Sequence, residues 1–205
     1  MDEYETLSLD RDRRGILTVT LNLTAKKNAL SAQMIADLTQ LADGAAEDAA
    51  NRVMLLRGAG DVFCAGGDLG WMKEQIETDR YRRMAEARKL AHMLRALNEM
   101  PLPLIGALHG GAFGGGVGLA CVCDVAIAET GTKFGLTETR LGLIPATISP
   151  YVIARMGEGK ARRVFMSARV FSAQEAKDLD IISDHALAHD MEARIEAEIA
   201  PYLSV

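Results

Sequence analysis

The sequence predicts one domain of the α/β class, in which strands and helices alternate along the chain. Short apolar runs rich in β-branched residues are separated by longer segments whose apolar residues recur every three or four positions. The chain has 205 residues, which is long enough for one well-buried core and short for two. No linker, internal repeat or low-complexity tract interrupts it. We therefore expect a single domain.

The first half of the chain contains two predicted strands and two predicted helices. Residues 15–21 and 52–57 are strand-like, and Gly58 ends the second run. A helix is expected to begin at Ser31, whose side chain suits an N-cap. The apolar face of this helix would consist of Met34, Leu38, Leu41, Ala42 and Ala45. A second helix is predicted over residues 81–99. Its repeating apolar positions are Ala87, Leu90, Ala91, Leu94 and Leu97.

The second half continues the alternation. Pro101 and Pro103 should stop the preceding helix, and residues 104–108 then form a buried strand. Residues 187–200 show the pattern expected for the start of a charged amphipathic helix. Further strand and helix segments are expected within residues 125–128, 148–167 and 173–182.

The composition excludes several classes of protein. Net charge is −5, so no general attraction to nucleic acid or to an anionic membrane is expected. No apolar run reaches the roughly 18 residues that a membrane-spanning helix needs. The acidic start of the chain is unlike a signal or transit peptide. Cys64, Cys121 and Cys123 form neither a disulfide framework nor a metal-ligand set, and they suit a reducing compartment. We expect a cytoplasmic protein without a metal ion.

Glycine is concentrated in two loops, each of which follows a predicted strand. The first covers residues 62–69 and the second covers residues 110–118. A strand followed by glycines and a helix start leaves backbone N–H groups pointing into open space, where they can hold an oxyanion. No Gly-Lys-Ser/Thr follows either loop, which excludes a phosphate loop, and a mid-chain position argues against a dinucleotide site. The alternative is that these glycines serve tight turns and close helix packing.

Five short segments of the chain form a recognisable series. They are Lys27-Asn28-Ala29-Leu30, Phe63-Cys64-Ala65-Gly66-Gly67-Asp68-Leu69, Ala112-Phe113-Gly114-Gly115-Gly116, Cys123-Asp124, and Phe134-Gly135-Leu136-Thr137-Glu138 leading to Leu141-Gly142-Leu143-Ile144-Pro145. In this order they resemble the motifs of the enoyl-CoA hydratase/isomerase (crotonase) superfamily, and residues 63–69 resemble its F-x-A-G-x-D-L signature. The similarity covers roughly residues 5–185. This resemblance implies a spiral of repeated ββα units with an acyl-CoA lying across strand ends.

The resemblance also implies where each part of the substrate would lie. The oxyanion hole would be the backbone N–H groups of Gly67 and Gly115, which polarise the thioester carbonyl and stabilise an enolate. The residues expected near coenzyme A are Lys26, Lys27, Ala29, Ala65, Asp68, Leu69 and Gly111. No cofactor is expected beyond the coenzyme A of the substrate. The family relationship further implies a homotrimer, or a dimer of trimers.

Glu138 occupies the position of a catalytic glutamate in this superfamily. Burial would raise its pKa toward the working pH, whereas an ion pair with Arg140 would lower it. The position of a second glutamate, which hydratases commonly use, holds Gly118. A single carboxylate favours an isomerase that moves a proton between two carbons of the acyl chain. The local similarity of residues 68–72 and 143–151 to hydratases of methylglutaconyl-CoA type favours hydration instead, with Thr147, Ser149 or Tyr151 available to orient water.

We therefore predict hydration of an α,β-unsaturated acyl-CoA with a branched or carboxylated acyl group. The alternatives are a Δ3-Δ2 enoyl-CoA isomerase and a catalytically inactive paralogue. RNA binding is not expected, because residues 31–50 contain no Lys or Arg and carry four acidic residues. Residues 1–186 would form the acyl-CoA-binding core. Residues 187–205 would begin a C-terminal helical region that is truncated relative to the superfamily.

Overall fold

The computed structural model describes residues 4–45 and 47–204, and it contains two sheets. The strands of the main sheet, in spatial order, are β1 (Leu7–Arg11), β2 (Ile16–Leu21), β3 (Val53–Gly58), β4 (Leu104–Leu108), β6 (Val125–Glu129) and β9 (Asp184–Ala186). β1 pairs antiparallel with β2, and every other neighbouring pair is parallel. The smaller sheet has the order β5 (Gly111–Phe113), β7 (Lys133–Gly135) and β8 (Val170–Ser172).

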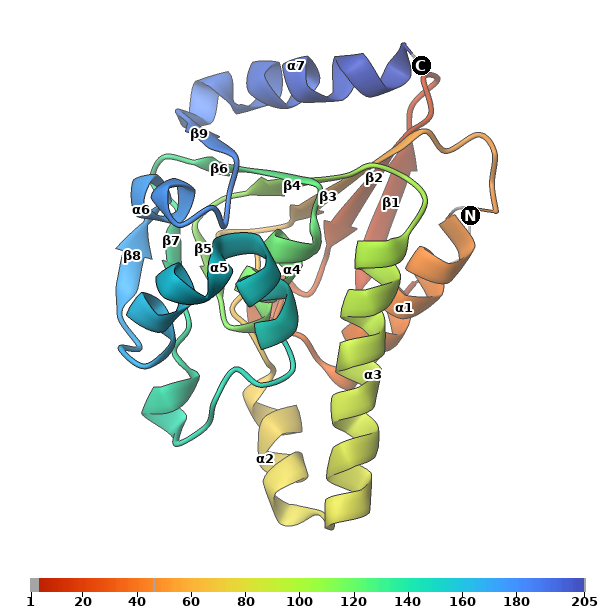
Figure 1. Cartoon of the computed structure of the whole chain (residues 1–205). Helices are drawn as coiled ribbons and strands as arrows, with labels where there is room; N and C mark the ends of the chain where they lie inside the picture. Colours follow the sequence, from red (N-terminus) through yellow and green to blue (C-terminus); the bar gives the residue numbers. More distant parts are fainter. Residues whose placement is uncertain (1–3, 46, 205) are drawn as a thin grey trace.

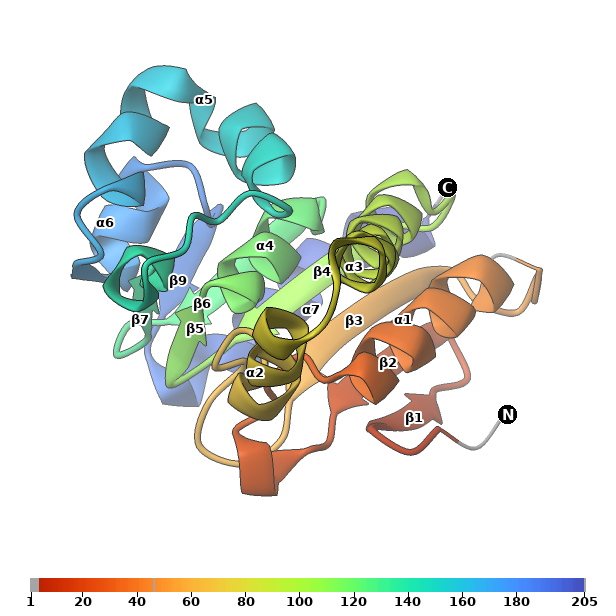
Figure 2. The ribbon, with the colours of Figure 1, turned by 90° about the horizontal axis from the view of Figure 1, so that it is seen from below.

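Helices cover both faces of the main sheet. The α-helices are α1 (Ala32–Ala45), α2 (Leu69–Glu77), α3 (Arg80–Glu99), α4 (Gly115–Val122), α5 (Ser149–Phe165), α6 (Ala173–Asp178) and α7 (Met191–Leu203). The 3₁₀ helices are η1 (Thr24–Lys26), η2 (Glu138–Leu141) and η3 (Ala188–Asp190). Figure 2 shows α1, α3 and α4 side by side over one face of the sheet. α7 lies across the opposite face (Figure 1).

The strands of the main sheet bury alternate residues in two separate apolar clusters. In β3, Met54 and Leu56 face the large cluster beneath α1, α3 and α4, whereas Val53 and Leu55 face the cluster beneath α7. α7 completes that second cluster with Met191, Ile195 and Ile199, which repeat every four residues along one helix face. Burial on both faces explains why these strands are near-continuous apolar runs.

Most predicted elements are confirmed, several short strands and helix α2 were not predicted, and one buried position is corrected. Ser31 accepts a hydrogen bond from the Met34 amide at the start of α1, as predicted. β1 was not predicted, because its five residues mix apolar and charged side chains, and neither were the three-residue strands β5, β7, β8 and β9. α2 was not predicted either, because it begins at the last residue of the first glycine segment. Ala87 was expected on the buried face of α3 but is exposed, because this half of the helix extends beyond the sheet.

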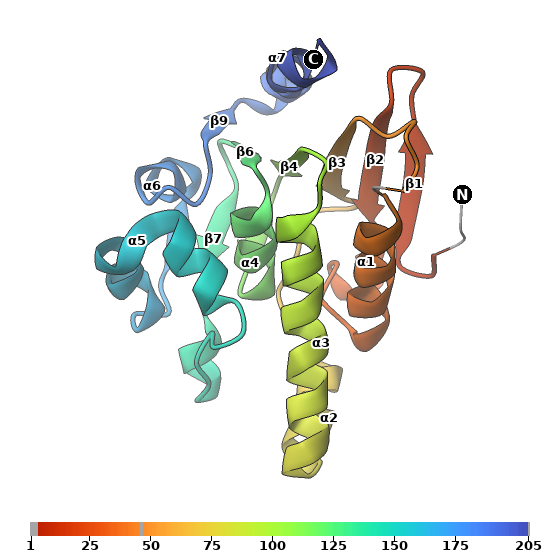
Figure 3. The same ribbon diagram turned by 45° about the vertical axis from the view of Figure 1, so that its right-hand side comes forward.

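Helices α2 and α3 form a hairpin that projects below the sheet (Figures 1 and 3). A hydrogen bond of 3.3 Å from Trp71 Nε1 to Glu86 Oε2 joins the two helices. Lys89 Nζ lies 2.6 Å from the other oxygen of Glu86. None of the residues buried in the core comes from α2, and those of α3 come from its second half. The hairpin is therefore held by these polar contacts and by the partly buried Trp71 and Leu90, which pack against the core.

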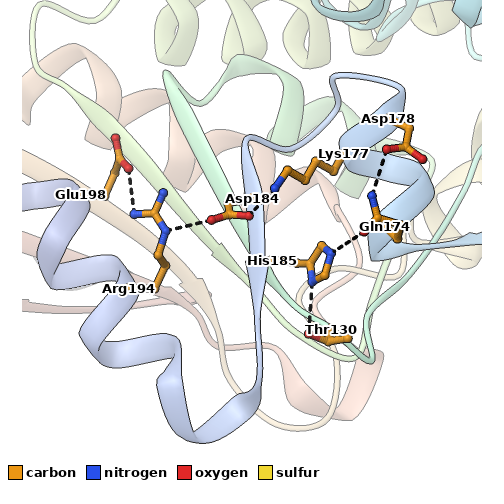
Figure 4. A network of polar contacts seen from close by, with 8 residues as sticks. All are labelled: Thr130, Gln174, Lys177, Asp178, Asp184, His185, Arg194 and Glu198. Atoms are coloured by element: carbon orange, nitrogen blue, oxygen red, sulfur yellow. Dashed lines mark hydrogen bonds and ion pairs between the residues drawn. The ribbon is translucent and has the colours of Figure 1, made fainter.

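Polar contacts tie the last elements of the chain together (Figure 4). The Asp184 carboxylate on β9 contacts Lys177 of α6 at 2.6 Å and Arg194 of α7 at 3.0 Å. The neighbouring His185 ring contacts the Thr130 hydroxyl and the Gln174 amide oxygen. β9 therefore joins the helix on each side of it to the edge of the main sheet.

Two further observations concern the described residues as a whole. No helix among residues 4–45 and 47–204 is long and apolar enough to cross a membrane. The three cysteines are buried and unpaired, and burial raises the pKa of each thiol to about 12.

Candidate active site

The two glycine loops lie against each other and are joined by backbone hydrogen bonds. The Cys64 amide donates to the Gly111 carbonyl at 3.1 Å, and the Phe113 amide donates to the Cys64 carbonyl at 3.0 Å. Gly66 has a φ of +98°, and a Cβ atom there would lie 2.9 Å from the Phe113 oxygen. The same Cβ position is 3.7 Å from the Gly115 nitrogen. Glycine at 66 therefore allows the second loop to approach the first closely.

Gly67 and Gly115 present amides without a backbone acceptor in the described part of the chain. Leu30 bridges the first loop, because its amide donates to the Gly66 oxygen and its carbonyl accepts from the Asp68 amide. These two hydrogen bonds leave the N–H of the intervening Gly67 without a backbone partner. Gly115 is the first residue of α4, where an N–H has no partner within the helix. The helix dipole adds partial positive charge at that position.

Glu138 brings a carboxylate against the second loop. A Cβ atom on Gly114 would lie 2.9 Å from Glu138 Oε1, so the glycine makes room for the carboxylate. Glu138 Oε2 is buried and has no hydrogen-bond partner in the described residues. Burial raises the pKa of this carboxyl. The exposed Arg140 forms no ion pair with it in the described chain, so the pKa-lowering alternative does not apply.

Gly67, Gly115 and Glu138 line one cavity of about 430 Å³. α2 and α3 form one wall of it, and the segment that follows η2 forms another. Most lining side chains are apolar, including Trp71, Leu90 and Ile148. The polar side chains on its surface are those of Gln75, Arg83, Thr137, Glu138 and Thr147. Among the described residues, no three His, Cys, Asp or Glu side chains are placed to hold a metal ion.

The structure brings together half of the predicted site residues. Those lining the cavity are Gly67, Gly115, Glu138, Ala65 and Leu69. Lys26 does not line it, and its ammonium lies 2.9 Å from Asp68 Oδ2. This contact, followed by the hydrogen bond from the Trp71 amide, lowers the pKa of Asp68, which caps α2. Through its contacts with Lys26 and the Trp71 amide, the Asp68 carboxylate therefore holds the loop in place.

The remaining predicted residues have backbone roles in the loops. The Lys27 carbonyl accepts a hydrogen bond from the Ala65 amide, and Ala29 is buried beside the lining residue Leu30. The buried Asn28 holds this loop, because its amide group donates to the Ala59 and Val62 carbonyls. Gly111 is buried in β5, away from the cavity, and its N–H and C=O both bond within the protein.

Ile148 fills the space beside Gly118. A Cβ atom on Gly118 would lie 2.8 Å from Ile148 Cγ2 and 3.1 Å from Ile148 Cβ. A glutamate at 118 would therefore require this side chain to move. Of the three residues proposed to orient water, Thr147 lines the cavity, whereas Ser149 donates to the Ala146 carbonyl and Tyr151 packs against the core.

Sequence reasoning missed the wall that the hairpin contributes. Trp71, Met72, Gln75 and Ile76 of α2 and Arg83 of α3 all line the cavity. A signal was present, because Asp68 is an N-cap residue and is followed by apolar residues at helical spacing. Asp68 belongs both to the first glycine loop and to the start of α2, so the start of this helix was not recognised.

This geometry agrees with the comparison to known proteins. The family model for enoyl-CoA hydratase/isomerase matches residues 11–196. The chain belongs to this family. An enoyl-CoA hydratase of Alternaria alternata, AKT6-1, is 35% identical over 93% of this chain, and the mouse mitochondrial methylglutaconyl-CoA hydratase is 33% identical over 93%. The chain spans 60% of the length of each of these two relatives.

Solved structures confirm the expected crotonase-like α/β fold. A crystal structure of an enoyl-CoA hydratase from Shewanella pealeana has a TM-score of 0.94 and 37% identity, over 99% of this chain and 76% of that one. AtuE of Pseudomonas aeruginosa has a TM-score of 0.93 and 36% identity, over 97% of this chain and 77% of that one. The superfamily resemblance of the five motifs is confirmed as well.

Proposed function

We propose that this protein hydrates an α,β-unsaturated acyl-CoA by way of an enolate. The observation that carries the proposal is the meeting, in one cavity, of two amides without a backbone acceptor and one half-buried carboxylate. The Oε2 atom of this carboxylate is buried and has no hydrogen-bond partner among the described residues. Amides of Gly67 and Gly115 are suited to a thioester oxygen that becomes negative during the reaction. Glu138, whose pKa is raised by burial, is suited to proton transfer near neutral pH.

The proposed reaction needs only one carboxylate. Ionised Glu138 takes a proton from water while the water oxygen bonds to the β-carbon of the acyl group. The electrons of the double bond move onto the thioester oxygen, where the two amides stabilise the charge. The same carboxyl then returns its proton to the α-carbon, and the thioester carbonyl is restored. The Thr147 hydroxyl, which lines the cavity, is available to orient the water.

Isomerisation is the second candidate, and the Gly118–Ile148 contact favours it. Ile148 occupies the space that a second carboxylate would need, so the cavity holds one acid/base group. One carboxylate is enough to move a proton between the α- and γ-carbons. Hydration is preferred because the motifs of the 143–151 segment resemble methylglutaconyl-CoA-type hydratases, and the mouse relative has that name.

Product analysis separates the two reactions. The protein is incubated with 3-methylglutaconyl-CoA and, separately, with a 3-enoyl-CoA, and the products are identified by mass and chromatography. A hydroxyacyl product, 18 Da heavier by the general chemistry of water addition, is expected from the first substrate. A 2-enoyl product from the second substrate, with no hydration of the first, would replace the proposal by isomerisation. No product from either would indicate an inactive paralogue.

We also propose that coenzyme A binds beside the first glycine loop, near Lys26, Lys27 and Ala29, and that the protein forms trimers. Compact ammonium groups suit phosphates, and the family relationship supports both statements. Lys27→Glu is expected to raise KM for the acyl-CoA about tenfold, since it replaces attraction to phosphate by repulsion. Light scattering tests the trimer, and a monomeric mass with intact activity would contradict it.

A further inference from the structure

The cavity has a polar end formed by the α2–α3 hairpin. Arg83, Ala87 and Leu90 line it from α3, and their spacing of four and three residues makes them one stripe. A rise of 1.5 Å per residue places Arg83 about 10 Å beyond Leu90 along the helix. Arg83 belongs to the first turn of α3, and Leu90 belongs to its second half. The first turn of α3 lies at the tip of the hairpin, and its second half lies nearer the sheet (Figure 3).

Arg83 is the one cation among the residues that line the cavity. Its guanidinium has no ion pair with any described residue. The nearby acids already have partners, because Glu86 contacts Lys89 and Trp71, and Asp79 contacts the Arg82 amide and guanidinium. A cation in the first turn of α3 also opposes the helix dipole. The charge of Arg83 helps to lower the pKa of the Asp79 carboxyl, but no acid of the described chain forms a close ion pair with its guanidinium.

Gln75 adds a second polar group to the same wall. Its Oε1 atom is buried and has no hydrogen-bond partner among the described residues. Buried polar atoms normally have a partner, so this amide is expected to find one in a bound molecule. A side-chain amide offers both donor and acceptor atoms to such a molecule.

We propose that Arg83 and Gln75 bind a carboxylate at the distal end of the acyl group and so select carboxylated enoyl-CoA substrates. This inference rests on the proposed function, which places the thioester at Gly67 and Gly115 and leads coenzyme A toward Lys26. The acyl chain is then the part of the substrate directed along the wall of α2 and α3. A guanidinium pairs with a carboxylate through two parallel hydrogen bonds. An acyl chain ending in a methyl group would leave both polar groups unpaired.

The test compares two substrates that differ in one terminal group. Pent-2-enedioyl-CoA ends in a carboxylate, and pent-2-enoyl-CoA ends in a methyl group. We expect kcat/KM to favour the carboxylated substrate by about tenfold or more. Arg83→Met should remove this preference, mainly through KM, and Arg83→Lys should retain part of it. Arg82→Met is the matched control, because Arg82 is its highly exposed neighbour and does not line the cavity.

A binding measurement separates this inference from the proposed reaction. Calorimetry with the saturated compounds glutaryl-CoA and pentanoyl-CoA needs no turnover. Tighter binding of glutaryl-CoA, lost in Arg83→Met and kept in Arg82→Met, supports the carboxylate site even if no hydration is found. Hydration of both substrates without preference, equal effects of the two variants, or absence of any acyl-CoA binding would each overturn it.

Discussion

The glycine loops and the α2–α3 hairpin line the same cavity but are built in opposite ways. The loops are joined by backbone hydrogen bonds and leave no room for a Cβ atom at Gly66 or Gly114. The hairpin projects from the body of the protein and is held by contacts such as that between Trp71 and Glu86. The loop backbone therefore supplies the amides proposed to hold the enolate oxygen, whereas side chains of the hairpin supply the groups proposed for selectivity. Substitutions in the two regions should accordingly have different effects.

Glu138→Gln should reduce kcat more than any other substitution in either region. It removes the one acid/base group of the cavity while keeping a similar shape, so kcat is expected to fall about 10²- to 10⁴-fold. Steady-state hydration of 3-methylglutaconyl-CoA measures the loss. Arg140→Gln, in the same 3₁₀ helix but exposed, should change kcat little. Turnover of Glu138→Gln within a few-fold of wild type would remove Glu138 from the mechanism.

Gly115→Pro tests the backbone contribution directly. Proline is tolerated at the first position of a helix, and here it deletes the N–H proposed to hold the enolate oxygen. We expect kcat to fall about 10²- to 10³-fold. Gly115→Ala is the control, since it keeps the N–H but places the same Cβ about 2.5 Å from Leu30 Cδ1. Equal losses in the two variants would mean that crowding of Leu30, and not the missing N–H, is responsible.

Gly118→Ala should destabilise the fold through its contact with Ile148. The added Cβ would lie 2.8 Å from Ile148 Cγ2, and such overpacking costs about 1–3 kcal/mol. Urea unfolding of Gly118→Ala, Ile148→Ala and the double variant measures the coupling between the two positions. The double variant should recover part of the loss, because alanine at 148 lacks the Cγ2 atom that the added methyl group would meet. Strictly additive effects would show that Ile148 does not limit position 118.

The raised pKa of Glu138 predicts a pH-dependent cost to stability. Since the folded-state pKa lies above the unfolded one, wild-type stability is greatest below the unfolded pKa and falls as pH rises through the folded pKa. Glu138→Gln carries no charge and escapes this loss, so it should be more stable than wild type at neutral pH. Thermal unfolding at several pH values should show the gap closing as pH falls. A gap that is independent of pH would be evidence against burial of the charge.

Glu86→Ala should give the smallest effect and reports on the hairpin alone. It removes the contacts with Trp71 and Lys89, which lie near the surface and contribute about 1 kcal/mol or less. We expect a small rise in KM for the acyl-CoA with little change in kcat, because the hairpin wall loosens while the glycine loops stay in place. Glu99→Ala, which removes an exposed contact with Arg95 farther along α3, is the control. A large drop in kcat would contradict the proposed separation of the two regions.

The sequence predicted the parts of the site that depend on local pattern. The two glycine loops, the helix after Ser31 and the importance of Glu138 all follow from short runs of residues. It did not reveal that Gln75 and Arg83 join Glu138 in one cavity, because their approach depends on how the hairpin packs. It also assigned Gly111 to coenzyme A, whereas the structure buries Gly111 in β5 away from the cavity.

By itself, the sequence determined the α/β class and most of the longer elements, since hydrophobic period is a property of neighbouring residues. It also indicated the family, through the resemblance of five short motifs. Only the tertiary structure decided that the Gly67 and Gly115 amides are both unoccupied beside one buried carboxylate. It also decided that Ile148 fills the space next to Gly118. These facts arise from contacts between segments that are distant in the chain. Such contacts depend on the packing of the whole domain and leave no local pattern.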